Sequence, residues 1–298
     1  MPRRRPPRWD AVPRQDGRRF VVTGASGGLG LATTRVLAAR GAEVVLAVRD
    51  TAKGEAVAAG MQGSVEVRRL DVASLASVRA FAAEVGRVDV LVNNAGVMAV
   101  PHALTVDGFE THLATNHLGH FALANLLLPR LTDRVVVVSS GAHRSADLDL
   151  TDLAWERRPY RPFAAYAASK LANLLFLAEL QRRLTAAGST LRATAAHPGS
   201  TATGITGSTG SRATTWVGSW GHRLAGMPPW KGALSILYAA TTDVPGNTYI
   251  GPGGVRELTG WPTGVGRSRE ACDPELAKEL WRRSEELTGV PFGLSPRP

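Results

Sequence analysis

Cysteine is almost absent from this chain. Cys272 is the only one among 298 residues, which excludes an internal disulfide and any metal site made of clustered cysteines. This usage is typical of proteins in a reducing compartment, so we expect a cytoplasmic location. Long apolar runs are missing too: no stretch approaches the roughly 18 residues that span a bilayer, and no hydrophobic signal segment follows the basic start. The sequence therefore predicts a soluble protein without a membrane span.

Metal-ligand patterns are also lacking. His112, His117 and His120 belong to one predicted helix, and no cysteine or acidic ligand accompanies them at a spacing that builds a site. We expect structural or surface roles for these three histidines and no bound metal. His143 and His197 end two predicted strands, and neither has an assigned role.

Acidic residues are too few to balance the basic ones, which leaves a formal net charge of +10. Half of this excess lies at the start, where residues 1–19 hold seven arginines against two aspartates, a local +5. Four prolines and little apolar periodicity in residues 1–13 predict a disordered Arg- and Pro-rich tail over residues 1–18. Aromatic residues that stack on bases do not alternate with these arginines, so we expect no nucleic-acid partner.

From residue 19 onward, short β-branched runs alternate with Ala- and Leu-rich stretches of helical period, as in repeated βαβ units around a parallel sheet. Because no internal linker interrupts this pattern, we expect one domain over residues 19–298. The predicted strands are Phe20–Thr23, Glu43–Val48, Val65–Leu70, Val88–Asn93, Arg134–Ser139 and Thr190–Ala196. The predicted helices are Leu29–Arg40, Ser74–Val85, Gly108–Leu128 and Ala164–Ala187.

Residues 200–230 break the alternation. They are rich in Gly, Ser and Thr but also carry Trp216, Trp220, Met227 and Trp230. A long irregular segment with large apolar side chains is typical of a lid or substrate loop. The apolar side chains favour a small apolar alcohol or carbonyl as substrate.

A glycine-rich turn joins the first strand to the first helix. Gly24, Gly28 and Gly30 follow Thr23 in the pattern T-G-x-x-x-G-x-G. Glycines at this place let the backbone approach a pyrophosphate, which the helix N-terminus attracts. The strand before the turn and the helix after it supply the context of a dinucleotide site.

The end of the second strand favours NADP over NAD. NAD enzymes place an acidic residue there to bind the ribose 2′-hydroxyl, but here Val48 is followed by Arg49. A guanidinium binds a 2′-phosphate through forked, charge-assisted hydrogen bonds. The alternative is a solvated Arg49 neutralised by Asp50.

Two further strand ends carry polar residues. Asp71 is placed to accept a hydrogen bond from an adenine amino group or to cap the turn before the helix at Ser74. Asn93, Ala95 and Gly96 lie in the stretch after the fourth strand, where amides bind backbone groups and glycine lets the chain pass close to a cofactor. By itself, this stretch fits a simple turn equally well.

Tyr166 and Lys170 are four residues apart in a predicted helix, so they share one face. A phenol with a pKa of ~10 needs a lowering of ~3 units, or ~4 kcal/mol, to act as a base at neutrality. An ammonium ~4 Å away supplies a comparable ~4 kcal/mol at an effective dielectric constant of ~20. Ser140 ends the fifth strand, where its hydroxyl can hydrogen-bond a reacting oxygen, and Ser139 is the rival.

These motifs, in this order, resemble the short-chain dehydrogenase/reductase family over about residues 19–287. Thr115–Phe121 and Tyr166–Asn173 look like its retinol dehydrogenase and WW-domain oxidoreductase branch, and Thr23–Thr33 also resembles protochlorophyllide reductases. The resemblance implies a single Rossmann-like, doubly wound α/β domain. Its sheet would have seven parallel strands in the order 3-2-1-4-5-6-7, with helices on both faces.

The resemblance also implies a catalytic tetrad in an NADP(H)-dependent oxidoreductase. Tyr166 would be the general acid/base, Ser140 would polarise the substrate oxygen, Lys170 would lower the tyrosine pKa and bind the nicotinamide ribose, and Asn116 would hold a relay water. Either Thr201 or Thr203 would contact the nicotinamide. The expected coenzyme contacts are Thr23, Gly24, Ser26, Gly28, Leu29, Gly30, Arg49, Asp71, Val72, Asn93, Ala95, Gly96, Tyr166, Lys170, Pro198, Gly199, Thr201 and Thr203.

Members of the family commonly pair through the helices that begin here near Gly108 and Ala164, which implies a homodimer or homotetramer. Two alternatives to the oxidoreductase are a non-catalytic NADP-sensing or partner-binding protein on the same fold and a protochlorophyllide reductase-like enzyme. The complete tetrad argues against the sensor. The position of the single cysteine, far from the motifs, argues against the second alternative.

Overall fold

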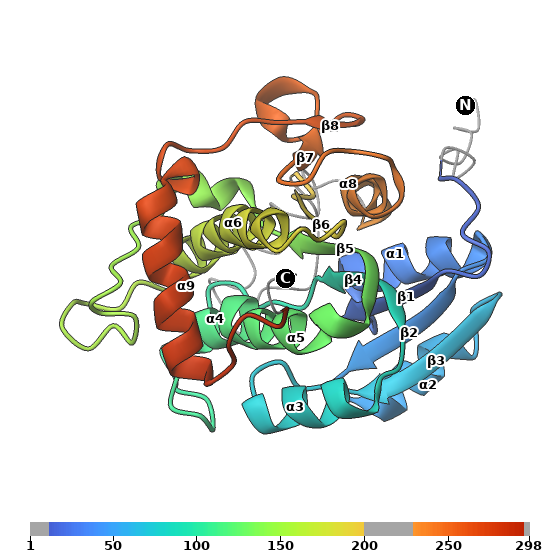
Figure 1. The fold of residues 1–298 in the computed structure, drawn as a ribbon, viewed down its shortest axis with the longest axis horizontal. Helices are drawn as coiled ribbons and strands as arrows, with labels where there is room; N and C mark the ends of the chain where they lie inside the picture. Colours follow the sequence, from blue (N-terminus) through green and yellow to red (C-terminus); the bar gives the residue numbers. More distant parts are fainter. Residues whose placement is uncertain (1–11, 200–228, 295–298) are drawn as a thin grey trace, which may run out of the picture.

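One eight-stranded sheet runs through the part of the chain that this computed structural model describes, residues 12–199 and 229–294 (Figure 1). Its strand order is β3-β2-β1-β4-β5-β6-β7-β8, and neighbouring strands are parallel except for the antiparallel pair β7–β8. The strands are β1 Arg19–Thr23, β2 Glu43–Val48, β3 Ser64–Arg69, β4 Val88–Asn93, β5 Leu131–Val138, β6 Arg192–Ala196, β7 Tyr249–Pro252 and β8 Pro262–Gly264.

Helices cover both faces of the sheet (Figure 1). The described helices are α1 Gly28–Ala39, α2 Thr51–Ala58, α3 Leu75–Glu84, α4 Thr111–Leu113, α5 Gly119–Leu127, α6 Pro162–Ala186, α8 Pro229–Thr241 and α9 Pro274–Thr288. A π-helical turn, Ala114–Leu118, joins α4 to α5. The sheet separates two hydrophobic cores, one shared with α1 and α8 and the other with α3, α5, α6 and α9.

The central strands are apolar throughout because both of their faces are buried. In β1, Phe20 and Val22 contribute to the core beside α1, whereas Val21 contributes to the opposite core. Every residue of β4 is buried. The strand order reverses between β1 and β4, so the carboxyl ends of these strands flank the crevice where doubly wound folds bind ligands.

The predicted fold class is confirmed, with one correction to the sheet. Seven parallel strands were expected, but the chain adds β8, which pairs antiparallel with β7. A short connection turns the chain straight back after β7, and only an antiparallel partner can be reached that way. The helix expected over Gly108–Leu128 begins only at Thr111 and is interrupted by the π-helical turn.

The expected tail and the expected lid are only partly within the described residues. In the tail expected to be disordered, residues 12–18 pack on the fold: Val12 is buried, and the Gln15 N–H donates to the Arg40 carbonyl over 2.8 Å. Residues 1–11 lie outside the described residues. So do Thr201, Thr203 and residues 200–228 of the expected lid, whereas Pro229 and Trp230 begin α8.

One described helix, α6, is long and apolar enough by length and composition to cross a membrane. This corrects the statement that no stretch approaches that length. However, 83% of its most apolar window is buried inside the fold, as is usual for the core helix of an α/β domain. The pattern therefore reflects packing between the sheet and α9.

Candidate active site

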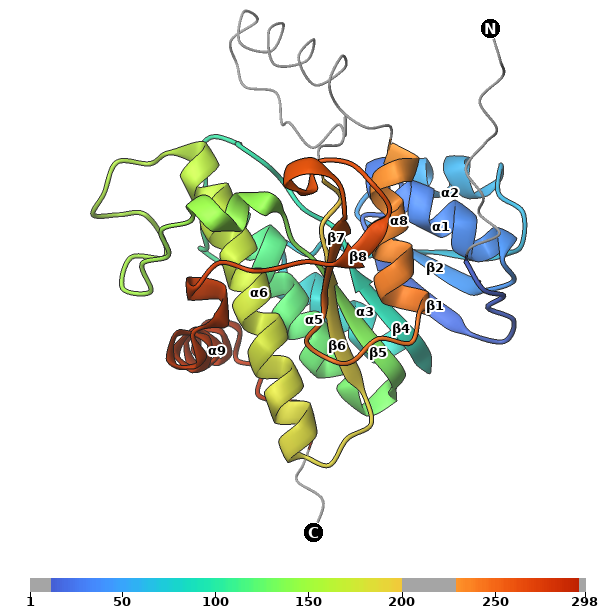
Figure 2. The ribbon, with the colours of Figure 1, turned by 90° about the horizontal axis from the view of Figure 1, so that it is seen from above.

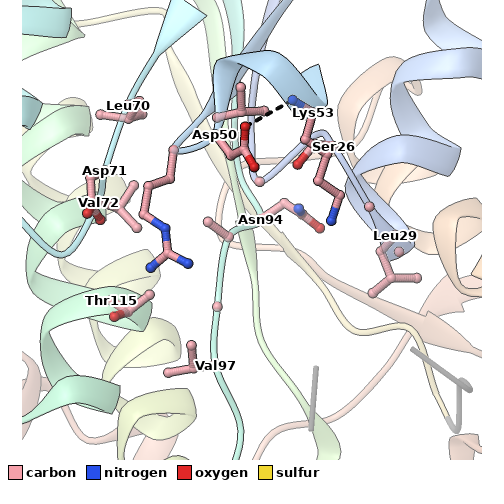
Figure 3. Close-up of a pocket in the computed structure, with 17 residues that line it drawn as sticks. Ser26, Leu29, Asp50, Lys53, Leu70, Asp71, Val72, Asn94, Val97 and Thr115 are labelled. Carbon is pink, nitrogen blue, oxygen red and sulfur yellow. Dashed lines mark hydrogen bonds between the residues drawn. The ribbon is translucent and has the colours of Figure 1, made fainter. Parts of the chain in front are cut away.

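A pocket of about 550 Å³ opens at the carboxyl ends of β1 to β4 (Figure 3). Its wall combines the glycine-rich turn with the ends of β2, β3 and β4. The close-up places Asp71 and Val72 across the pocket from Leu29. The lining residues are Gly24, Ser26, Gly27, Gly28, Leu29, Val48, Arg49, Asp50, Lys53, Leu70, Asp71, Val72, Asn94, Ala95, Gly96, Val97 and Thr115.

The glycine-rich turn brings bare backbone to the pocket wall. Gly24 and Gly28 adopt positive φ angles of 67° and 52°, which favour glycine. A Cβ on Gly30 would lie 2.5 Å from the Gly24 carbonyl oxygen, so that position has no room for a side chain. No side-chain hydrogen bond caps the N-terminus of α1 at Gly27. The first N–H groups of this helix are suited to bind a phosphate.

Two cationic side chains line the same pocket. Arg49 follows β2, as the sequence indicates, and Lys53 comes from the first turn of α2. The Lys53 Nζ lies 4.0 Å from the place that a Cβ on Gly27 would occupy. Asp50 caps α2 by accepting a hydrogen bond from the Lys53 N–H over 2.9 Å (Figure 3). Sequence reasoning missed Lys53, because no apolar period marks the short helix that places it at the pocket.

Asp71 performs the local role expected of it. Its Oδ1 accepts the Ala73 N–H over 3.0 Å, and its own N–H donates to Ser77 Oγ over 2.9 Å. Ser74 caps α3 by accepting the Ser77 N–H. Because Asp71 also lines the pocket, the contact with adenine remains a prediction.

Two of the expected coenzyme contacts, Asn93 and Thr23, do not line this pocket, and their contact with a coenzyme remains a prediction. Asn93 is buried beneath the site and does not line the pocket, whereas the next residue, Asn94, does. Thr23 is also fully buried, and its Oγ1 accepts the N–H groups of Asn94 and Ala95, each over 2.9 Å. Thr23 therefore fixes the β4 end against β1 instead of facing the pocket. Most of the other predicted contacts line the wall, namely Gly24, Ser26, Gly28, Leu29, Arg49, Asp71, Val72, Ala95 and Gly96.

Tyr166 and Lys170 project from the buried face of α6. The Lys170 Nζ donates to the Val138 carbonyl over 3.1 Å and lies 5.8 Å from the centroid of the Tyr166 ring. It is also 3.6 Å from the place that a Cβ on Gly96 would occupy, which puts the ammonium at the end of the pocket wall. The structure therefore brings together the residues that the Tyr-x-x-x-Lys spacing selected.

The two serines after β5 differ in their hydrogen bonds, and only Ser140 has a hydroxyl that can reach a substrate. Ser139 is buried, and its Oγ donates to the Lys170 carbonyl over 2.8 Å. Ser140 is only partly buried, and its hydroxyl interacts with the Tyr166 phenol. This geometry favours Ser140 as the hydroxyl that meets a substrate.

Burial controls both ionisable groups of this pair. It raises the pKa of Tyr166, and the hydrogen bond with Ser140 opposes the rise. It lowers the pKa of Lys170 to about 8. In this structure desolvation has the largest effect on the phenol pKa, and the lowering of that pKa by the Lys170 ammonium remains a prediction. A protonated phenol is suited to donate a proton.

Asn116 lies in the π-helical turn, and its side chain is used for structure. Its Oδ1 accepts the Val97 N–H over 2.8 Å, and its Nδ2 donates to the Val97 carbonyl over 3.0 Å and to Ser169 Oγ over 2.8 Å. Both amide hydrogens are thus occupied. A relay water at this residue would therefore have to donate to an oxygen, either Oδ1 or the main-chain carbonyl.

Histidines without assigned roles hold two further loops. His143 Nδ1 donates to the Ser140 carbonyl over 2.7 Å, and its Nε2 accepts the Ser268 N–H over 3.2 Å. His197 Nδ1 accepts the Gly199 N–H over 3.3 Å. The hydrogen bonds tie Ser140 and the Pro198–Gly199 turn to their surroundings, which no local pattern in the sequence could show.

Gly199 also has a positive φ of 69°, and a Cβ there would lie 2.6 Å from the Leu258 carbonyl oxygen. The chain after β7 therefore packs directly against the turn at the end of β6. Neither Pro198 nor Gly199 lines the 550 Å³ pocket. Their contact with a nicotinamide remains a prediction.

Comparison with known proteins gives a consistent result. The family model for short chain dehydrogenases matches residues 18–214. Human "Retinol dehydrogenase 13" is 41% identical over alignments covering 92% of this chain and 85% of that protein. Mouse "Polyprenol dehydrogenase" is 40% identical, with coverages of 97% and 88%.

Among solved structures, an uncharacterised protein from Mycobacterium paratuberculosis superposes with a TM-score of 0.84 at 53% identity, covering 96% of this chain and 98% of that one. A short chain dehydrogenase from Burkholderia cenocepacia in complex with NADP superposes with a TM-score of 0.61 at 25% identity, covering 79% and 96%.

Proposed function

We propose that this chain, which belongs to the short-chain dehydrogenase family, is an NADP(H)-dependent oxidoreductase. Its proposed substrate is an apolar alcohol, aldehyde or ketone. The single observation that carries the proposal is the meeting of Ser140, Tyr166 and Lys170 beside the end of the pocket. These groups serve a reaction in which a proton and a hydride reach the two atoms of a carbonyl group.

The chain's own residues supply the proton. Tyr166 holds its phenolic proton because burial raises its pKa, and Ser140 hydrogen-bonds the substrate oxygen and orients it. When bound, NADPH supplies the hydride to the carbonyl carbon. The substrate oxygen then takes the proton of Tyr166, and Lys170 stabilises the resulting phenolate. In the direction of oxidation, the same phenolate accepts the proton of the alcohol.

The preference for NADP rests on the charge of the adenosine end of the pocket. Arg49 and Lys53 line it, and no ion pair of Arg49 with an acidic side chain occurs within residues 12–199 and 229–294. The Asp50 carboxylate accepts the Lys53 backbone N–H. A 2′-phosphate would meet two cations there, which supports NADP over NAD.

An apolar substrate is supported by two observations. The names of the two relatives refer to retinol and polyprenol, both alcohols with long apolar chains. In this chain, Val255, Leu258 and Trp261 are exposed large apolar residues in the turn after β7, and the Leu258 backbone packs on Gly199. An apolar chain leaving the reacting carbonyl would meet these side chains.

A panel of apolar aldehydes and ketones tests the proposal, with the absorbance of NADPH as the measurement. We expect turnover with at least one member, and we expect Tyr166→Phe to lower it by roughly 100-fold or more, since the proton donor is lost. NADPH affinity should change little in this variant. NADPH binding without turnover on the whole panel would instead favour the non-catalytic, NADP-sensing alternative.

A further inference from the structure

His120 lies at the start of α5, directly behind the candidate site. The residue is buried, and both nitrogens of its ring have a partner. Nε2 is 2.9 Å from Thr23 Oγ1, and Nδ1 is 3.2 Å from the Asn116 main-chain oxygen. One side chain therefore bridges the end of β1 and the π-helical turn.

These contacts define which nitrogen carries the hydrogen. A carbonyl oxygen can only accept, so Nδ1 must donate to Asn116. Burial lowers the pKa of His120 to about 4, so the ring is neutral near pH 7 and Nε2 carries no hydrogen. Nε2 then accepts the hydrogen of the Thr23 hydroxyl.

The hydrogen bonds of Thr23 agree with this tautomer. Its Oγ1 already accepts two N–H groups, from Asn94 and Ala95. A hydroxyl oxygen has two lone pairs and one hydrogen, so the remaining bond of Thr23 must be donated. Two acceptors lie within reach of this hydrogen, the bare Nε2 of His120 at 2.9 Å and the Val92 carbonyl at 3.4 Å, and the shorter distance favours His120. A continuous set of hydrogen bonds thus runs from the pocket wall through His120 to the carbonyl of Asn116.

The Asn116 carbonyl matters because the amide of the same residue is already used. Both amide hydrogens of its side chain are bound and its Oδ1 already accepts the Val97 N–H, so the main-chain oxygen is a further acceptor that a relay water can use. A carbonyl in a π-helical turn lies where the regular ladder of helix hydrogen bonds is disturbed. The Nδ1–H of His120 donates to that oxygen over 3.2 Å and so fixes the direction of one of its lone pairs.

We propose that His120 is a positioning residue, which fixes the direction of the Asn116 carbonyl and couples it to the wall of the coenzyme pocket through Thr23. The proposal rests on the proposed function, in which a proton must be returned to Tyr166 after each turnover. His120 touches neither substrate nor coenzyme in this scheme. It acts only through Asn116 and Thr23.

His117, three residues before His120 in the π-helical turn, provides a matched control for the substitutions at His120. It is also buried, but its Nε2 bonds Ser284 Oγ of α9 over 2.9 Å, on the side away from Thr23. Its ring packs on Phe121 and Phe176, at centroid distances of 6.1 and 6.0 Å. A substitution here removes a buried histidine from the turn without touching the bridge.

Two conservative variants separate the halves of the bridge in the full-length chain. In His120→Asn, the amide nitrogen replaces Nδ1 and keeps the bond to the Asn116 carbonyl. In His120→Gln, the amide group replaces Nε2 and keeps the bond to Thr23. Each variant is compared with the wild type and with His117→Gln. The measurements are kcat, the KM for NADPH and the solvent deuterium isotope effect on kcat, at NADPH and substrate saturation.

We expect His120→Gln to lower kcat about tenfold, with a larger solvent isotope effect and a KM for NADPH within about twofold of the wild type. His120→Asn should lose less than about threefold. His117→Gln should lower the midpoint of thermal unfolding without changing the isotope effect. Equal losses in both His120 variants, or no loss in either, would overturn the proposal.

The tautomer supplies a measurement that does not depend on turnover. In ¹⁵N NMR of the full chain with NADPH, the imidazole signals missing from His120→Asn should be those of a neutral ring with hydrogen on Nδ1. Signals of an Nε2–H ring would overturn the proposed bridge. Absence of turnover in the wild type would count against the proposed function alone.

Discussion

The Lys170 ammonium shows how burial sets the chemistry of a single residue. Its pKa is lowered to about 8 by desolvation, so the cation is present below that pH and is lost as the pH rises through it. The Tyr166 pKa is raised, so the phenol stays protonated over the same range. The two shifts together favour carbonyl reduction below pH 8.

We therefore expect kcat/KM for reduction to fall as the pH rises through about 8, because the neutral lysine no longer stabilises the phenolate. The measurement is the pH profile of kcat/KM with NADPH between pH 6 and about 10. This parameter reports the pKa values of groups in the free enzyme. Lys170→Arg, which keeps its charge, should lose this descending limb. A limb at the same pH in that variant would assign it to another group.

The proposed preference for NADP rests on Arg49 and Lys53, the two cationic side chains that line the pocket. Replacing either with alanine should raise the Kd for NADPH about tenfold or more, since a hydrogen bond to a charged group contributes ~1.5–3 kcal/mol. NADH, which has no 2′-phosphate, should bind nearly as in the wild type. Fluorescence titration measures both constants. The control is Lys278→Ala, which removes a cation from an exposed position of α9. Equal losses for the two coenzymes would contradict the assignment.

Helix α9 is the element that most changes the picture obtained from the sequence. Its Trp281 is buried against Phe121 and Phe176, with centroid distances of 4.8 and 5.7 Å. The Arg183 guanidinium lies over the same indole at 4.5 Å. The C-terminal segment thus completes the core between α5 and α6 (Figure 2).

Shortening the buried Trp281 side chain should destabilise the fold. We expect Trp281→Ala to lower the free energy of unfolding by about 3–5 kcal/mol, the usual cost of deleting a large buried aromatic side chain. Urea denaturation followed by circular dichroism measures it. Trp261→Ala is the matched control, because Trp261 is 65% exposed and its loss should change stability by about 0.5 kcal/mol or less. Similar losses in both variants would show that α9 does not dock as described.

Several elements with a strong local pattern were predicted well, whereas the positions of α2, α8, α9, β7 and β8 were not predicted. The strands β1, β2 and β4 are buried apolar runs, and their predicted positions agree with the structure to within a residue. Helix α2 was missed because only Gly54 in it is buried, so no apolar period marks it. Strand β8 has three residues and little burial, and its pairing with β7 is its only signature.

In the whole molecule, α9 covers helix faces that two copies of the chain would need for pairing. The homodimer or homotetramer expected from the family resemblance would use the helices near Gly108 and Ala164, and α9 packs on α6 and on the turn before α5. A pairing through that face would have to displace the buried Trp281.

We therefore expect light scattering after size exclusion to give the monomer mass of 31.5 kDa. A dimer that dissociates when exposed residues of α6 are changed would contradict this expectation. The cytoplasmic location inferred from cysteine usage also remains a proposal, which cell fractionation would test.

The sequence by itself determined the positions of the central strands, the glycine-rich turn and the four-residue spacing of Tyr166 and Lys170. Each of these is encoded within a few neighbouring residues, through backbone preference or helix geometry. The tertiary structure decided that Asn94 and not Asn93 lines the pocket, that Ser139 Oγ is bound to the Lys170 carbonyl, that Lys53 lines the pocket, and that His120 bonds Thr23. These outcomes depend on distances between residues far apart in the chain and on burial, which also shifts the pKa of Tyr166 and of Lys170. Neither quantity is encoded in the local sequence.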